Sequence, residues 1–190
     1  MQGKKKVKRK FLKQFLKDRQ MVGAINPSTR FLGEKMVENV DFKSAELIVE
    51  LGPGTGVFTD IILELMRDDA KLLVFELNDH FYEQLADRIN DPRVEVIHDS
   101  AANITDYLNE EEKNNVDVII SSLPLTVFPE KLRKDVVSNA YASLKNRGIY
   151  KQFQYSLQAK KLLESTYKEV SIKFTLKNFP PAFVYTCQKK

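Results

Sequence analysis

Three closely spaced glycines are the residues of this sequence best placed to hold a small ligand. Gly52, Gly54 and Gly56 follow a short apolar run and precede a segment with helical periodicity. Without side chains, the backbone there can turn sharply and lie close to a ligand. The spacing is G-x-G-x-G, which differs from the G-x-G-x-x-G of dinucleotide-binding loops because position 57 is valine. The loop therefore predicts a close approach to a nucleoside.

A carboxylate is expected to face the same ligand. Glu76 ends the second predicted strand, twenty residues after Gly56. Ligands of open α/β sheets bind outside the carboxyl ends of the strands, where the strand order reverses. There the Glu76 carboxylate can accept hydrogen bonds from both ribose hydroxyls. The alternative is a tight turn followed by a solvated glutamate, and the coincidence of loop, carboxylate and strand pattern disfavours it.

Two further strand ends carry polar residues that fit this crevice. Asp99 follows the third predicted strand and can accept a hydrogen bond from an adenine amino group. It can equally be part of an ordinary helix N-cap with Ser100, because Asp and Ser both favour that position. The run from Ser121 to Leu125 follows the fourth strand, and Pro124 stiffens a loop that would face the reactive group.

The elements that must position these residues alternate between strand and helix. Strands are predicted at 46–51, 71–77, 93–97, 116–121 and 148–154, with helices near 57–66, at 79–89 and after Pro129. Such alternation indicates a parallel sheet with helices on both faces. Near the end, 170–176 and 182–188 are strand-like and flank a turn too short for a crossover helix. We therefore expect a terminal antiparallel hairpin.

The basic charge of the chain is concentrated at its beginning. The net charge is +4, but residues 1–20 carry +8 and the remaining 170 residues carry −4. This basic arm predicts a polyanionic partner, either a nucleic acid or an anionic membrane surface.

The arm also has an apolar stripe at helical spacing, which favours a helix lying in a membrane interface. Each Lys or Arg near an anionic surface contributes about 1 kcal/mol to binding. Alternatively, the lysines grip RNA phosphates, or the stripe packs on the domain as a lid. The residues assigned to membrane binding are Lys4, Lys5, Lys6, Lys8, Lys10, Phe11, Leu12, Phe15 and Leu16.

The remaining features point to one cytoplasmic domain. The 190 residues suit a single domain, and no apolar run approaches the roughly 20 residues of a membrane span. No secretory signal is visible.

Cys187 cannot form an internal disulfide and is expected in a buried strand. His80 and His98 lack paired ligands at metal-binding spacing, so no metal site is expected.

Residues 49–56 (VELGPGTG) resemble the first motif of class I S-adenosylmethionine-dependent methyltransferases. The resemblance implies a Rossmann-like α/β fold, with a seven-stranded, mostly parallel sheet and an antiparallel C-terminal strand. It implies S-adenosylmethionine as cofactor, with Glu50 and the glycines near its methionine part, Glu76 on the ribose and Asp99 near the adenine. The residues assigned to the cofactor are Glu50, Gly52, Pro53, Gly54, Thr55, Gly56, Glu76, Leu77, Asp99, Ser100 and Ser121.

A narrower resemblance, to bacterial phospholipid N-methyltransferases, covers nearly the whole chain. It rests on 22–28, 122–125 with 128–129, 153–155 and 178–182. The resemblance implies methylation of the phosphatidylethanolamine amine at the cytoplasmic face of the membrane, which an N-terminal amphipathic helix would contact. It divides the chain into that helix at 1–22 and a methyltransferase domain at 23–190. One departure is Ser156, where that family has glycine.

The competing family is the ribosomal RNA adenine dimethyltransferases, whose fourth motif is Asn-Leu-Pro-Tyr. Its Asn side chain and the adjoining carbonyl hold the target amine, while the Tyr stacks on the flipped base. Here the two positions are Ser122 and Leu125, and no separate helical RNA-binding domain is expected after the last strand. Nucleic acid is therefore the less favoured partner, and no obligatory protein partner is evident. A third alternative is a homologue that binds the cofactor or a membrane without transferring methyl.

Methyl transfer from a sulfonium is a direct in-line displacement that needs no covalent nucleophile. The acceptor must first lose a proton, because an ammonium has no lone pair. The residues assigned to orienting the amine or passing on its proton are Ser122, Leu123, Pro124 and Tyr155, with Leu123 acting through a backbone carbonyl.

Overall fold

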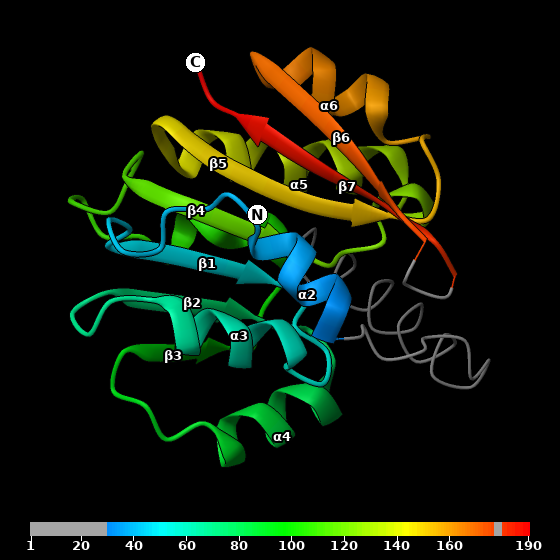
Figure 1. Cartoon of the computed structure of the whole chain (residues 1–190). Helices are drawn as coiled ribbons and strands as arrows, with labels where there is room; N and C mark the ends of the chain where they lie inside the picture. The colour runs from blue at the N-terminus through cyan, green and yellow to red at the C-terminus, as the bar shows by residue number, and fades with distance from the viewer. Residues whose placement is uncertain (1–29, 177–179) are drawn as a thin grey trace.

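A single seven-stranded sheet with the order β3-β2-β1-β4-β5-β7-β6 forms the centre of the molecule (Figure 1). The computed structural model describes residues 30–176 and 180–190. β7 is antiparallel to both of its neighbours, and β1 to β5 are mutually parallel. The strands are β1 (Leu47–Leu51), β2 (Lys71–Phe75), β3 (Val94–Ile97), β4 (Val116–Ser121), β5 (Leu144–Gln154), β6 (Glu169–Thr175) and β7 (Ala182–Gln188).

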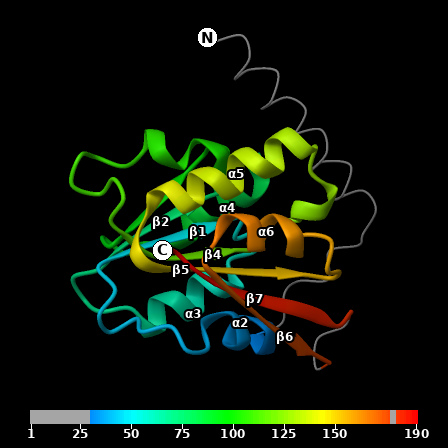
Figure 2. The same ribbon diagram turned by 90° about the horizontal axis from the view of Figure 1, so that it is seen from above.

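Helices cover both faces of this sheet (Figure 2). One apolar cluster joins α2 and α3 to the sheet, and the other joins α5, α6 and the 3-10 turn η1 to its opposite face. Among the described residues, no helix is both long and apolar enough to cross a membrane. The helical elements are α2 (Arg30–Val37), α3 (Val57–Leu65), α4 (Asp79–Arg88), η1 (Ala101–Asp106), η2 (Leu125–Val127), α5 (Glu130–Ser143) and α6 (Lys160–Thr166).

The architecture confirms the predicted fold class, including the antiparallel C-terminal strand. The largest boundary error concerns β5, which begins at Leu144 rather than at 148, because α5 ends at Ser143 and Leu144 pairs at once with Val116. The second strand ends at Phe75, so Glu76 lies just beyond it. The sequence patterns did not predict α2, α6 or η1. The basic arm 1–22, with its assigned membrane-binding residues, and the motif segment 22–28 lie outside the described residues.

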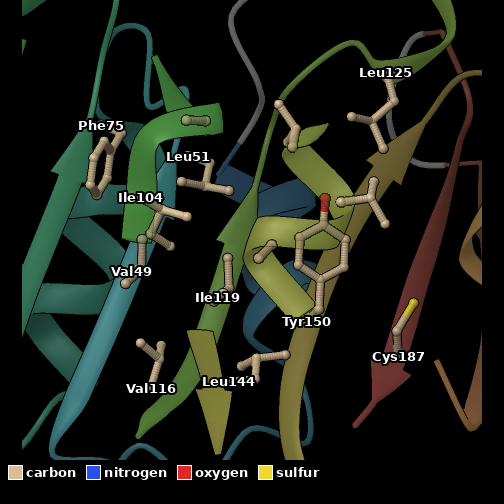
Figure 3. Close-up of a cluster of buried hydrophobic side chains, with 14 of the residues drawn as sticks. Val49, Leu51, Phe75, Ile104, Val116, Ile119, Leu125, Leu144, Tyr150 and Cys187 are labelled. Atoms are coloured by element: carbon tan, nitrogen blue, oxygen red, sulfur yellow. The ribbon is translucent and has the colours of Figure 1, made fainter. Parts of the chain in front are cut away.

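The sheet is buried on both faces, which explains why β1 is apolar at four of its five positions. All five residues of β1 are buried, and Val49 and Leu51 join the cluster under α5 (Figure 3). Cys187 belongs to the same cluster, and burial raises the pKa of its thiol to about 12. Cys187 lies in β7 and is fully buried, which confirms the prediction of a buried strand residue.

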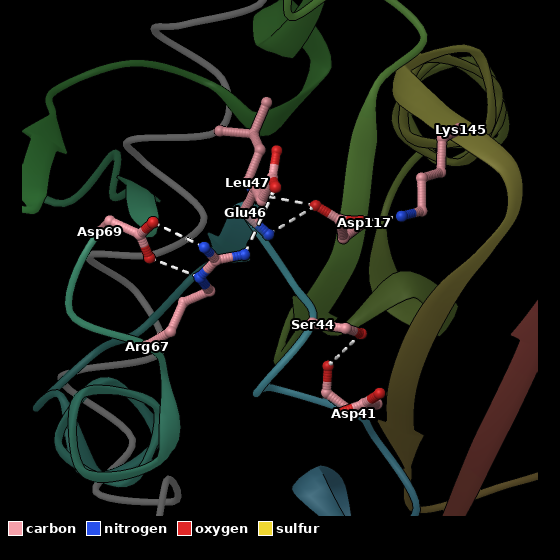
Figure 4. A network of polar contacts seen from close by, with 8 residues as sticks. All are labelled: Asp41, Ser44, Glu46, Leu47, Arg67, Asp69, Asp117 and Lys145. Atoms are coloured by element: carbon pink, nitrogen blue, oxygen red, sulfur yellow. Dashed lines mark hydrogen bonds and ion pairs between the residues drawn. The ribbon is translucent and has the colours of Figure 1, made fainter.

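Asp117 stabilises the start of β1, at the edge of the sheet where the parallel strands begin (Figure 4). Its carboxylate accepts the backbone N–H groups of Glu46 at 2.8 Å and Leu47 at 2.9 Å, and it pairs with Lys145. Because Asp117 is buried, its loss would leave two backbone donors without an acceptor. The start of β1 is therefore held by a side chain of the neighbouring strand.

We expect Asp117→Ala to lower the free energy of unfolding by about 2–4 kcal/mol, because two charge-assisted hydrogen bonds are lost. Urea denaturation measures this change. Lys145→Ala is the matched control, and the half-exposed lysine should cost less than about 1 kcal/mol. Equal losses in the two variants would show that the ion pair, rather than the backbone bonds, stabilises this edge.

Candidate active site

The glycine loop after β1 leaves open space at one position only. All three glycines have positive φ angles, of 72° at Gly52, 58° at Gly54 and 86° at Gly56. A Cβ on Gly52 would lie 2.7 Å from Leu123 Cδ2, so this glycine lets the loops after β1 and β4 pack together. A Cβ on Gly54 would meet no atom within 4 Å. Gly54 therefore presents bare backbone to a space that a ligand can occupy.

Glu76 joins the loops after β1 and β2. Its carboxylate accepts the backbone N–H of Gly54 at 3.1 Å and that of Asn78 at 2.8 Å. Burial raises the pKa of Glu76, while these backbone hydrogen bonds act in the opposite direction. The carboxylate thus lies beside the open backbone of Gly54, in the position expected for a ribose partner.

Glu50 is a fully buried acid with one unsatisfied oxygen. Thr59 Oγ1 donates to its Oε2 at 2.6 Å, whereas Oε1 has no hydrogen-bond partner within the described residues. Burial raises the pKa of Glu50 to about 8. A buried polar atom without a partner costs free energy, so such an atom is a candidate for contact with a ligand.

Asp99 is held by the turn that follows β3. It accepts the Ser100 N–H at 2.7 Å, Asn103 Nδ2 at 3.0 Å and the Tyr107 hydroxyl at 2.8 Å. Ser100, rather than Asp99, caps η1 by accepting the Ala102 N–H at 3.3 Å. The structure therefore gives Asp99 a clear local role, and its contact with an adenine stays a prediction.

The loop after β4 is fixed through the carbonyl of Leu123. That oxygen accepts Gln152 Nε2 at 3.0 Å, Gln154 Nε2 at 2.9 Å and the Leu125 N–H at 2.9 Å. The last bond closes an inverse γ-turn at Pro124, whose φ and ψ are −79° and 71°. Three donors already bind this carbonyl, so it holds the loop in place, and its predicted contact with a substrate amine stays a prediction.

Gln152 and Gln154 are site residues that the sequence patterns missed. Both are buried on the same face of β5, and the Gln152 amide is oriented by the Tyr150 hydroxyl, which donates to its Oε1 at 2.7 Å. The available signal was two amides at alternate positions near the end of a predicted strand, because buried amides are normally hydrogen-bonded.

Ser122 and Tyr155 remain the candidates for contact with an acceptor amine. The Ser122 N–H donates to the Leu51 carbonyl at 2.9 Å, which places Ser122 directly beside the glycine loop. The Tyr155 ring packs edge-on against Phe153 with centroids 5.6 Å apart, and Phe153 packs in the same way against Phe58 at 6.0 Å. Since Phe58 lies in the first turn of α3, Tyr155 stands on the glycine-loop side of β5.

The other assigned residues have mainly structural surroundings. Leu77 has its side chain in the hydrophobic core, and the Ser121 hydroxyl accepts the Leu123 N–H at 3.4 Å. His98 stacks on Tyr82 with ring centroids 4.4 Å apart and pairs with Asp79 at 2.9 Å. Within 30–176 and 180–190, no group of three acidic, histidine or cysteine residues could hold a metal ion.

Residues 4–142 match the model of the ribosomal RNA adenine dimethylase family. The chain belongs to that family. One relative is an ornithine lipid N-methyltransferase of Singulisphaera acidiphila, 27% identical over 180 residues that make up 94% of each chain. Another is the ribosomal RNA small subunit methyltransferase A of Borrelia garinii subsp. bavariensis, 29% identical over 138 residues. This match spans 67% of the present chain but only 45% of the Borrelia protein.

Solved structures show the same fold at lower sequence identity. A spermidine synthase bound to a transition-state analogue has a TM-score of 0.70 and 16% identity, covering 86% of this chain and 62% of that chain. A putative rRNA methylase from Clostridium thermocellum has a TM-score of 0.63 and 18% identity, covering 84% of this chain and 96% of that one. These structural similarities support the methyltransferase fold and do not identify the molecule that accepts the methyl group.

The family and the fold identify the protein as an S-adenosylmethionine-dependent methyltransferase. The structure fits this cofactor, since Gly54 offers an open backbone and Glu50 an unpaired buried oxygen. Glu76 would hold the ribose and Glu50 the methionine part. When bound, S-adenosylmethionine supplies an electrophilic methyl group on a sulfonium.

We expect the affinity for S-adenosylmethionine to rise with pH because Glu50 must lose its proton to face a cationic ligand. Its pKa of about 8 means that the folded protein holds this proton at lower pH, so binding releases it. Affinity should increase by up to about tenfold per pH unit between about pH 6 and 8, and then level off. Isothermal titration calorimetry measures the slope.

Glu50→Gln is the control for this pH dependence, since the cofactor's own amine titrates equally with both proteins. The variant should bind weakly and lack the additional slope. Parallel pH profiles for the variant and the wild type would contradict the role of Glu50.

We expect Gln154→Leu to lower the kcat of methyl transfer about tenfold, because losing one hydrogen bond loosens the Leu123 carbonyl. Cofactor affinity should change less than kcat, since Gln154 contacts the glycine loop only through Leu123. The matched control, Gln158→Leu, changes an exposed glutamine four residues further along. A loss of cofactor affinity in parallel with kcat would point to general unfolding instead of loop positioning.

Proposed function

We propose that this protein transfers methyl groups from S-adenosylmethionine to the head-group amine of phosphatidylethanolamine or its methylated forms. The transfer would take place at the cytoplasmic surface of the membrane. The observation that carries the proposal is the burial of Leu125. The fourth motif of the RNA-modifying relatives has a tyrosine at this position, which stacks on the flipped base.

Leu125 cannot serve as such a stacking platform. Its side chain is fully buried in the cluster beneath α5, beside Tyr150 (Figure 3). Substituting a tyrosine would require either overpacking the core or turning the loop outward. In the loop after β4, a buried leucine therefore stands where the RNA-modifying relatives have a base-stacking tyrosine.

The polar groups next to Leu125 also differ from those that bind the planar amino group of adenine in the RNA-modifying relatives. Ser122 stands where that motif has asparagine, and the Leu123 carbonyl is saturated by Gln152, Gln154 and Leu125. Two acceptors that would fix an adenine amino group are thus absent or occupied. A flexible primary amine needs fewer directional contacts, which Ser122 and Tyr155 can supply.

These residues would act by orientation and by proton handling. The acceptor ammonium must lose a proton before it can attack, and the half-exposed Ser122 and the exposed Tyr155 can relay that proton to water. The fixed loop then holds the amine in line with the methyl group. Such positioning lowers barriers by several kcal/mol, up to about 7–11 in well-oriented systems.

Two further observations support an amphiphilic acceptor. The ornithine lipid N-methyltransferase is matched over 94% of both chains, whereas the Borrelia RNA enzyme is matched over 45% of its own length. The basic arm of residues 1–20, with its net charge of +8, suits an anionic membrane surface.

Adenine methylation in RNA is the second candidate function. The family to which the chain belongs is named for that reaction, and its model matches 139 residues, 4–142. The basic arm would suit RNA phosphates as well as a membrane. The two candidates therefore differ in the loop after β4 and not in the cofactor pocket.

A methyl-transfer assay with radiolabelled cofactor should offer lipid vesicles and unmethylated ribosomal RNA in parallel. We expect label in phosphatidylethanolamine and none in RNA, because the loop after β4 suits a flexible amine. Vesicles that contain an ornithine lipid form a further arm, which separates the two amine head groups.

Three outcomes would contradict the proposal. Label confined to RNA would establish the second candidate, and label confined to ornithine lipid would correct the head group. Cofactor binding without label in any acceptor would indicate a homologue that no longer transfers methyl. Deleting residues 1–20 should lower labelling of vesicle lipid sharply and leave cofactor affinity nearly intact.

A further inference from the structure

Five of the seven exposed large hydrophobic side chains in the described part of the chain lie at one edge of the sheet. Among the described residues, the large hydrophobic side chains with the greatest exposure are Leu176 at 75% and Phe174 at 54%, followed by Leu157 at 46%. Tyr155 and Val127 are exposed to nearly the same degree. We call these five residues the apolar rim.

The strand order places all five at the same edge. Val127 follows β4, Tyr155 and Leu157 follow β5, and Phe174 and Leu176 lie where β6 ends. β4, β5 and β6 point in one direction, since β7 is antiparallel to both β5 and β6. The carboxyl ends of these strands therefore share the edge that carries the glycine loop, as the arrowheads of β1 and β5 in Figure 1 and of β6 in Figure 2 show.

The loops that bear the rim contain no acidic residue. Segments 122–129, 155–159 and 176–183 hold a single charged residue, Lys177. The loops after β2 and β3, which face the cofactor, instead carry Glu76, Asp79 and Asp99. The loops of one half of the edge therefore carry carboxylates, whereas those of the other half are apolar and are followed by Glu130 at the start of α5.

Lysines border the apolar half. Lys160 and Lys161 begin α6 directly after the loop 155–159, and Lys173 precedes Phe174 on β6. Lys173 pairs with Glu38 at 3.2 Å and Lys160 with Glu164 at 3.6 Å, so both border the apolar side chains with their charges partly neutralised. Apolar loop side chains bordered by lysines match the interface of an anionic bilayer. An RNA surface would require several basic groups in the contact area itself, which these loops lack.

We propose that the apolar rim is a membrane-docking surface that inserts into the lipid interface and turns the methyl-transfer site towards the bilayer. It would act in addition to the basic arm, whose net charge of +8 would supply electrostatic attraction. This inference rests on the proposed function in one respect, namely that the acceptor is a lipid. Docking of the rim would let the lipid head group reach Ser122 without leaving the membrane.

The absence of tryptophan from the sequence allows a direct test with the full-length protein. Leu157→Trp and Leu176→Trp each place one fluorophore on the rim. Leu65→Trp is the matched control, because Leu65 is 43% exposed but lies at the end of α3, at the opposite edge of the sheet. The probes are vesicles of phosphatidylethanolamine and phosphatidylglycerol, with and without brominated acyl chains.

We expect emission from both rim variants to shift to shorter wavelength on vesicles and to lose about half its intensity to brominated chains. The Leu65→Trp emission should do neither, although that protein sediments with the vesicles. Rim emission that stays unchanged in vesicle-bound protein would overturn the proposal, as would a failure of the protein to bind vesicles. A shift produced by ribosomal RNA and not by vesicles would also overturn it, in favour of nucleic acid.

A charge variant separates docking from chemistry. Leu157→Asp combined with Leu176→Asp should lower methylation of vesicle lipid about tenfold and leave methylation of a water-soluble short-chain phosphatidylethanolamine unchanged. Leu65→Asp should change neither rate. Equal losses on both forms of the lipid would overturn the docking role. If neither form is methylated by the wild type, the proposed function fails, while the fluorescence result still decides on the rim.

Discussion

The hydrogen bond from the Gly54 N–H to Glu76 is the interaction on which the site depends. It joins the loops after β1 and β2, next to the point between β1 and β4 where the strand order reverses, and it holds a buried carboxylate beside bare backbone. Because Gly52 packs against Leu123, the same loop also fixes the distance to the segment after β4. Cofactor and acceptor sites are thereby coupled through one short stretch of backbone.

Buried polar groups, rather than exposed ones, define the chemistry of this edge. Glu50 keeps one oxygen unpaired in the interior, which is costly unless a ligand satisfies it. The opposite holds at Leu123, whose carbonyl is fully used by Gln152 and Gln154. The Glu50 carboxyl is therefore available to bind a ligand, whereas the Leu123 carbonyl holds a loop in place. Both groups lie at the same edge of the sheet.

The fold was largely predictable from the sequence because the central strands β1, β2 and β4 carry apolar runs that are separated by segments of helical periodicity. The glycine loop and Glu76 followed from the same pattern. What sequence patterns could not supply was the direction of side chains after the strands end. Leu125 and Tyr155 are both apolar or aromatic residues in loops, yet one is buried and the other exposed. That difference depends on how the loop after β4 packs against β5, which is a tertiary contact between residues about 30 positions apart.

Hydrogen–deuterium exchange of the full-length protein tests the central claim most directly, namely that one half of the edge binds cofactor and the other half meets lipid. S-adenosylhomocysteine alone should slow exchange in 50–56 and 76–79, since these are the loops expected to contact the nucleoside. Adding phosphatidylethanolamine–phosphatidylglycerol vesicles should then slow exchange in 122–129, 155–159 and 176–183. Unchanged exchange in these three segments on vesicles, or protection of them by ribosomal RNA instead, would contradict the account.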